Sequence, residues 1–144
     1  MKVLIDTNVI LDVLIGREPH LYASAAFLKL CGTKVTGFIT ANQTTDIFYL
    51  LRRDGKTPTE SKTIIKKLTD QIKIMDVNAI DVNNALDAGM PDYEDALLAY
   101  RAKRQNARYI VTRNGTDYTK SPVAAISPQS FLDKILPITQ PSSR

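Results

Sequence analysis

Short apolar runs alternate along almost the whole chain with longer segments of helical periodicity. The runs are rich in Val, Ile and Leu, and most of them are apolar on both faces. That pattern is typical of short strands buried inside a covered sheet. We predict strands at residues 2–5, 35–40, 72–77, 107–112 and 122–127.

The intervening segments carry start and stop signals for helices. Thr57 is followed by Pro58 and, three residues on, by Glu60, which together form a capping box with proline at the first helical position. Gly16 and Gly89 stand where two other segments end. We predict helices at residues 7–15, 21–32, 41–55, 57–72, 78–89, 92–106 and 127–136.

Strands that alternate with helices in this way predict an α/β fold, with a parallel sheet of about five strands and helices on both faces. A length of 144 residues indicates one domain. We place that domain at residues 1–136 and a loose C-terminal tail at residues 137–144. A chain of this size buries roughly 70% of its unfolded surface, so its core needs no disulfide or structural metal.

Composition narrows the class of protein further. The single cysteine, Cys31, excludes an intramolecular disulfide and fits a reducing cytoplasm. No apolar stretch approaches the ~20 residues that span a bilayer, and the start of the chain lacks a signal-peptide pattern, so we expect a cytoplasmic protein without a membrane segment. With His20 as the only histidine, Cys/His zinc sites and a Ser-His-Asp triad are disfavoured.

Four aspartates lie near the ends of predicted strands, where parallel sheets carry their sites. Asp6 directly follows the first strand, and Asp46 lies in the helix after the second. Asp95 lies in the helix that leads into the fourth strand, and Asp117 in the loop after it. Taken singly, each has a structural alternative: a helix cap, an exposed helix residue, a first-turn acid or a turn residue.

Three stretches of the sequence, LIDTNVILDVL, DYEDALLAYRA and YIVTRNGTDY, resemble in order and spacing the motifs of the PIN-domain nucleases. The resemblance runs from about residue 2 to residue 132. Within that family the chain is most similar to the VapC-type toxins of type II toxin–antitoxin pairs. The resemblance implies a five-stranded parallel sheet, an acidic pocket for Mg²⁺ or Mn²⁺, and hydrolysis of RNA. It also implies an antitoxin protein as partner and a homodimer.

By this resemblance, Asp6, Asp46, Asp95 and Asp117 form the catalytic acidic quartet, and Asp6, Asp95 and Asp117 are the expected metal ligands. The second position is more often Glu in the family. Asp46 therefore has a shorter arm, which suits contact with a metal through water.

Other polar positions match the family pocket as well. Asn8, Thr112 and Asn114 correspond to residues that orient the carboxylates or a phosphate. Asp92, one turn before Asp95, is either an additional acid or the cap of its helix, and we favour the cap.

A cluster of carboxylates is best understood as a metal site, because packed carboxylates repel and one of them would otherwise stay protonated. Oxygen ligands select the hard ions Mg²⁺ and Mn²⁺. Beside a phosphodiester, one such ion can activate a water nucleophile, and a second about 3.5–4 Å away can stabilise the leaving oxygen. The sequence leaves open whether one ion or two is used.

The charge balance fits a polyanionic substrate. The formal net charge is +4, and once the quartet is set aside 19 basic residues face 11 acidic ones. Contacts between these residues and phosphates would make binding depend on salt. Candidates are Arg52, Arg53, Lys56, Lys62, Lys66, Lys67, Arg101, Lys103 and Arg104.

Two rival enzyme classes fit less well. A haloacid dehalogenase-type phosphohydrolase needs a second Asp two residues after the first, where this chain has Asn8. A receiver domain needs an acidic pair at the first strand, which is missing here. Two alternatives within the PIN family remain open: an inactive domain that binds RNA or protein, and a housekeeping RNA-processing nuclease.

Overall fold

The computed structural model describes residues 1–136, in which five strands form one parallel sheet of order β3-β2-β1-β4-β5. The predicted parallel α/β fold is therefore confirmed. The predicted tail, residues 137–144, lies outside the described residues. The strands are β1 (Lys2–Ile5), β2 (Thr36–Thr40), β3 (Lys73–Met75), β4 (Tyr109–Val111) and β5 (Ala125–Ile126).

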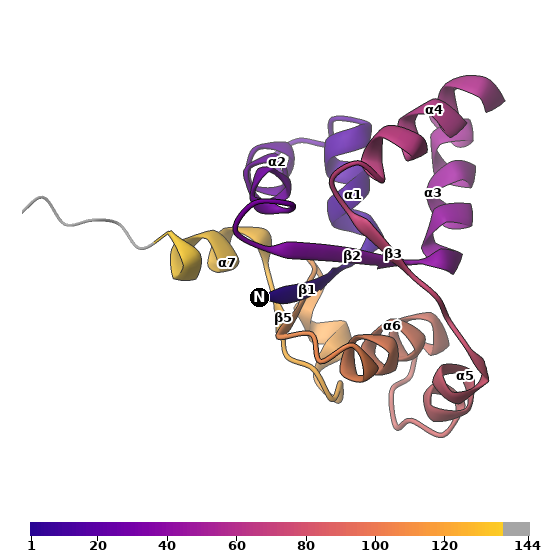
Figure 1. The fold of residues 1–144 in the computed structure, drawn as a ribbon, viewed down its shortest axis with the longest axis vertical. Helices are drawn as coiled ribbons and strands as arrows, with labels where there is room; N and C mark the ends of the chain where they lie inside the picture. Colours follow the sequence, from indigo (N-terminus) through magenta and orange to yellow (C-terminus); the bar gives the residue numbers. More distant parts are fainter. Residues whose placement is uncertain (137–144) are drawn as a thin grey trace, which may run out of the picture.

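Helices cover both faces of the sheet. Helices α1 to α4 lie on one face with α7 beside α2, and α5 and α6 lie on the other (Figure 1). Within residues 1–136, none of them is both long and apolar enough to cross a membrane. Their bounds are α1 (Thr7–Leu14), α2 (Leu21–Leu30), α3 (Ala41–Arg53), α4 (Pro58–Leu68), α5 (Ala79–Leu86), α6 (Tyr93–Arg104) and α7 (Pro128–Ile135), with a 3-10 turn η1 at Gly115–Tyr118.

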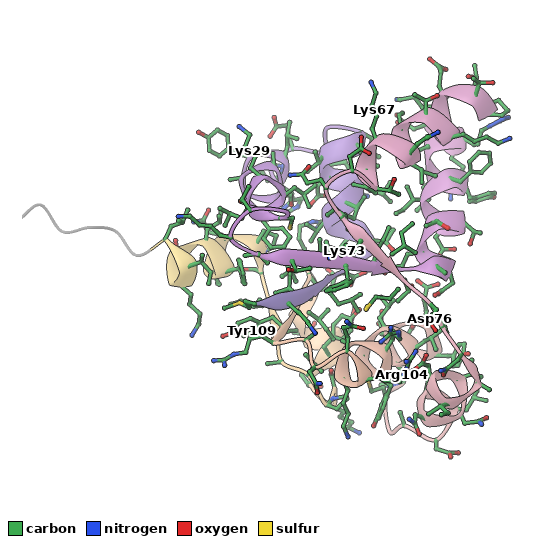
Figure 2. The ribbon with its side chains drawn as sticks, viewed as in Figure 1. Lys29, Lys67, Lys73, Asp76, Arg104 and Tyr109 are labelled. Carbon is green, nitrogen blue, oxygen red and sulfur yellow. The ribbon has the colours of Figure 1, made fainter. Side chains whose placement is uncertain are left out.

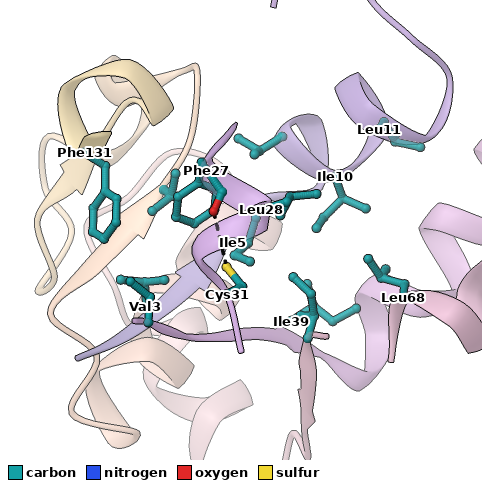
Figure 3. Packing of buried hydrophobic residues seen from close by; sticks show 14 of the residues in the cluster. Val3, Ile5, Ile10, Leu11, Phe27, Leu28, Cys31, Ile39, Leu68 and Phe131 are labelled. Atoms are coloured by element: carbon teal, nitrogen blue, oxygen red, sulfur yellow. Dashed lines mark hydrogen bonds between the residues drawn. The ribbon is translucent and has the colours of Figure 1, made fainter. Parts of the chain in front are cut away.

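The central strand β1 explains why its residues are apolar on both faces. Val3 and Ile5 belong to the core under α1, α2 and α7, whereas Leu4 belongs to the core under α6, and all three side chains are fully buried. In the first core, Phe27 of α2 packs edge-to-face on Phe131 of α7, with ring centroids 5.3 Å apart (Figure 3). Because β1 is the central strand, its carboxyl end lies between other elements. The polar residue that follows it, Asp6, therefore has neighbours from several parts of the chain.

Local signals set most helix starts. Thr57 and Glu60 form the predicted capping box of α4. The helix ends at Leu68, short of the predicted residue 72, because Ile72 packs into the core from the turn before β3. Its apolar side chain extends the helical pattern in the sequence without extending the helix.

Candidate acidic site at the carboxyl ends of the strands

Strand pairing brings together two residues that are far apart in the sequence. β1 and β4 are parallel neighbours in which Ile5 pairs with Val111, so Asp6 and Thr112 both follow at the same edge of the sheet. The Thr112 hydroxyl donates a hydrogen bond to Oδ2 of Asp6 over 2.9 Å. The carboxyl ends of the two strands thus form the floor of the candidate site.

Asp6 occupies the N-cap position of α1, but its side chain makes no capping hydrogen bond. Instead the carboxylate accepts from the hydroxyls of Thr112 and, over 3.0 Å, Tyr118. Burial raises the pKa of Asp6 above its ordinary value, against the lowering effect of these two hydroxyls. These two hydroxyls connect the carboxylate to residues that follow β4.

Tyr118 connects Asp6 with Asp95. Its hydroxyl lies 3.0 Å from Oδ2 of Asp6 and 3.3 Å from Oδ1 of Asp95, and the residue is only 3% exposed. Burial, with the charges of both carboxylates, raises the pKa of the Tyr118 phenol, so it remains a protonated donor. The sequence did not predict a role for this residue, because a single aromatic side chain usually indicates a core position. The only signal in the sequence was its position directly after Asp117.

Asp95 stands in the first turn of α6. Its backbone N–H donates to Oδ1 of Asp92 over 2.9 Å, so Asp92 caps the helix, as we favoured. Burial raises the pKa of Asp95 to about 6, and the negative charges of Asp92, Asp6 and Asp117 add to the effect. Asp117, in η1, is thus close enough for its charge to act on both Asp6 and Asp95, which are half-buried.

Asp46 takes a different place from the other three members of the predicted quartet. It lies on α3 and is half-buried. Partial burial raises the pKa of Glu94, and the charge of Asp46 is the next cause, ahead of Asp92 and Asp6. Asp46 of α3 is thus near enough to Glu94 of α6 for its charge to act on that acid, and we call these two residues the acidic rim. Sequence reasoning did not single out Glu94.

The predicted pocket residues form one hydrogen-bonded chain behind Asp6. Asn8 donates from Nδ2 to the Thr112 hydroxyl over 3.3 Å, and its Oδ1 accepts from the backbone N–H of Arg113 over 3.3 Å. Asn114 contributes its backbone N–H, which donates to the Thr112 hydroxyl over 3.0 Å. Asn8 and Thr112 thus act through their side chains, whereas the part Asn114 plays in this chain comes from its backbone.

Another aspartate, for which the sequence did not predict a role, is linked to this hydrogen-bonded network through two arginines. Asp12 of α1 is fully buried, with Arg113 Nε 2.6 Å from Oδ2 and Arg17 Nε 3.2 Å from Oδ1. The Ser24 hydroxyl donates to it over 3.0 Å, and Arg17 also donates to the backbone carbonyl of Asn8. The signal in the sequence was a charge at a core-facing position inside an otherwise apolar helix.

A small pocket of about 160 Å³ opens beside the acids, with room for several water molecules, since each takes about 30 Å³ in the liquid. Within residues 1–136, no group of three or more His, Cys, Asp or Glu side chains stands in an arrangement that could already hold a metal ion. The acids that line the pocket nevertheless offer oxygen donors, and the charges of Asp92 and Asp117 add to the burial that raises the pKa of Asp95, so these donors fit a hard divalent cation. The lining residues are Pro91, Asp92, Asp95, Thr116, Asp117, Thr119 and Lys120.

Two of the predicted phosphate contacts, Arg101 and Arg104, already bind aspartates of this chain, and the prediction for Arg101 is wrong. Arg101 is buried and bonds to the carbonyl and the carboxylate of Asp76, so it is not available at the surface. Arg104 makes a two-pronged contact with Asp81 and lies beside Asp76 (Figure 2). These arginines fasten α5 and the end of β3 to α6.

The fold resembles those of several solved structures. VapBC2 from Rickettsia felis, bound to a promoter DNA fragment, gives a TM-score of 0.70 at 17% identity, over 88% of this chain and 98% of that one. A toxin–antitoxin complex from Klebsiella pneumoniae gives 0.67 at 15% identity, over 88% and 97%. VapC20 from Mycobacterium tuberculosis, described as a toxin that cleaves the sarcin–ricin loop, gives 0.65 at 11% identity, over 80% and 92%.

At these identities the likeness concerns the fold. A comparison with curated protein sequences gave no match. A family model described as the PIN domain matches residues 2–116, which is most of the chain. The chain therefore belongs to the PIN domain family.

Proposed function

We propose that this protein is a metal-dependent endoribonuclease and the toxin of a toxin–antitoxin pair. The observation that supports the proposal is the Tyr118 hydroxyl, which contacts both Asp6 and Asp95, together with Asp117, whose charge acts on both acids. None of the ion pairs within residues 1–136 involves these three carboxylates. Their charge is thus left to be balanced by something that binds.

Asp6, Asp95 and Asp117 would hold the cation, and their oxygen donors favour Mg²⁺ or Mn²⁺. When bound, the cation lowers the pKa of a water nucleophile and offsets charge on the scissile phosphate. Asp46 completes the proposed quartet from the rim, where its short side chain acts through water. That rim carboxylate, or Glu94 beside it, can accept the proton that the attacking water loses.

The chain's own residues fix the orientation of Asp6. Thr112 donates to Asp6, and Asn8 in turn donates to Thr112, so the carboxylate cannot turn freely. Such outer contacts decide how well a metal ligand is aimed. We assign Asn8, Thr112 and Asn114 to this orienting role.

Exposed basic side chains would contact RNA phosphates. Lys120 lines the acidic pocket and is exposed, so it is a contact that the sequence did not indicate. Lys103 and the lysines of α4 remain candidates from the sequence. Because phosphate contacts release counterions, we expect RNA binding to weaken as salt rises.

For the partners, we propose an antitoxin with a basic segment that covers the acidic pocket, since opposite charge favours that contact. We also propose a homodimer in the cytoplasm. Ile80 and Leu86 of α5 are 60% and 65% exposed, and such apolar side chains suit a surface between two copies. The similarity to described VapBC and toxin–antitoxin complexes supports the partner, not its identity.

The test is RNA cleavage by protein freed of any copurified partner, using a panel of structured RNAs with Mn²⁺, Mg²⁺ or EDTA. We expect metal-dependent cutting that falls by at least about 100-fold in Asp6→Asn, because about 100-fold is the upper end of the loss when only a partner of a metal ligand is removed. Asp70→Asn, at an exposed residue after α4, is the matched control and should cut normally. Failure of the wild type both to cut RNA and to bind Mn²⁺ would favour an inactive binding module.

Cutting alone leaves the toxin role to be tested. Expression with and without the protein encoded by the neighbouring gene separates the two remaining roles. A toxin should arrest growth unless the neighbour is present. A housekeeping nuclease should show no such dependence.

A further inference from the structure

The Tyr118 hydroxyl is shared between two carboxylates that come from different elements. Asp6 leads into α1, whereas Asp95 belongs to α6, on the other face of the sheet. Residue 118 is 3% exposed and is part of the core that packs against α6. The ring is therefore held in place by packing, and its hydroxyl is a fixed point between the two acids.

We propose that Tyr118 is a positioning residue that holds Asp6 and Asp95 together, so that the free oxygen of each can bind one shared divalent cation. This inference rests on the proposed function. The hydroxyls of Thr112 and Tyr118 both donate to Oδ2 of Asp6, and the Tyr118 hydroxyl contacts Oδ1 of Asp95. The remaining oxygen of each carboxylate is not used by Tyr118.

The two acids depend on Tyr118 unequally. Asp6 has a second side-chain donor in Thr112, at 2.9 Å. For Asp95, the hydrogen bonds found within residues 1–136 include no side-chain donor other than Tyr118. Loss of the hydroxyl should therefore release Asp95 first, because repulsion from Asp6 would turn it toward solvent. Binding a cation would then require the two carboxylates to move back together, which would lower the affinity for the cation.

Tyr118→Phe isolates the hydroxyl, because it keeps the buried ring. Tyr109→Phe is the matched control: Tyr109 is partly buried, with its ring 6.0 Å from that of Phe131, and it starts β4, at the end of that strand opposite the acids. Asp6→Asn serves as the reference for a damaged site.

The experiment is a titration of RNA-free protein with Mn²⁺, in which electron paramagnetic resonance reports the free ion. We expect Tyr118→Phe to bind about 10-fold more weakly, the usual loss when a partner of a metal ligand is removed. Tyr109→Phe should bind as the wild type does. In cleavage assays, the Mn²⁺ requirement of Tyr118→Phe should rise by the same factor, with the maximal rate at saturating Mn²⁺ changed less than about threefold.

The outcomes separate this inference from the proposed function. Wild-type Mn²⁺ affinity in Tyr118→Phe, with binding lost in Asp6→Asn, would overturn the positioning role and leave the metal site standing. A maximal rate that high Mn²⁺ fails to restore would also overturn it, since the hydroxyl would then act on a step other than metal binding. Absence of Mn²⁺ binding by the wild type would overturn both proposals.

Discussion

Asp6 and Asp12 lie six positions apart, Asp6 just before α1 and Asp12 inside it, yet their carboxylates have opposite kinds of neighbours. Asp12 is fully buried between the guanidinium groups of Arg17 and Arg113. Asp6 meets the hydroxyls of Thr112 and Tyr118 and faces further carboxylates. One carboxylate is balanced from within the chain, and the other is not.

The difference separates a structural acid from a candidate ligand. A buried carboxylate with its own cations ties elements together, here α1 and α2 to the end of β4. A carboxylate that receives only neutral donors keeps its negative charge unbalanced. Burial raises the pKa of Asp6 and of Asp95, the neighbouring acids add to the effect, and such surroundings favour a bound cation. Burial alone does not distinguish the two, but the partners do.

The largest effect on stability should come from Asp12→Ala. It leaves two guanidinium groups and the buried Ser24 without their shared acceptor. Breaking a buried pair costs ~3–5 kcal/mol, and because both arginines reach solvent we expect about 3 kcal/mol less free energy of unfolding in urea.

Asp6→Asn tests whether Asp6, unlike Asp12, contributes little to stability. It keeps an oxygen acceptor for Thr112 and Tyr118 while it removes a repelled charge. We expect its free energy of unfolding to stay within about 1 kcal/mol of the wild type. Equal losses in the two variants would mean that both aspartates are structural.

The next effect is stabilisation by metal. A ligand at 100 times its dissociation constant stabilises the folded state by about 2.7 kcal/mol. For a chain of this length that corresponds to a rise in Tm of roughly 8 °C, which calorimetry with Mn²⁺ against EDTA would measure. Asp6→Asn should lose the rise, whereas the exposed control Asp70→Asn should keep it.

The smallest expected effect is a change of stability with pH in EDTA. The pKa of Asp95 is raised to about 6 in the folded protein, so the native state holds this proton more tightly than the unfolded chain does. The stabilisation is complete below about pH 4, the ordinary pKa of an aspartate, and is lost as pH rises through about 6. Asp95→Asn lacks this titration.

The measurement is the free energy of unfolding in urea at pH 5 and pH 7.5 for both proteins. The stability of the wild type relative to Asp95→Asn should fall as the pH rises. A difference that does not change with pH would show that burial and the nearby acids do not raise the pKa of Asp95 in the folded protein.

Several site residues were predictable from the sequence because a general rule places them. Parallel strands end at one edge of a sheet, so acids that follow successive strands converge. Asp6 and Thr112 meet for this reason, across 106 positions of the chain. Capping by Asp92 and by Thr57 with Glu60 was also readable, because these contacts span only three residues.

Other assignments depended on which elements pack together. Nothing in the local sequence shows that Arg101 turns inward to Asp76, 25 positions away, or that Arg113 reaches Asp12 across 101 positions. Tyr118 was missed for the same reason, since only the placement of α6 brings Asp95 to its hydroxyl.

By itself, the sequence determined the alternation of strands and helices, the helix starts, the family motifs and the acids at the strand ends, because these follow from local periodicity and from chain order. The tertiary structure decided which charges are balanced. Pairing depends on distance in space, and side chains such as Asp6 and Asp12 acquire opposite surroundings only when helices from remote segments pack around them.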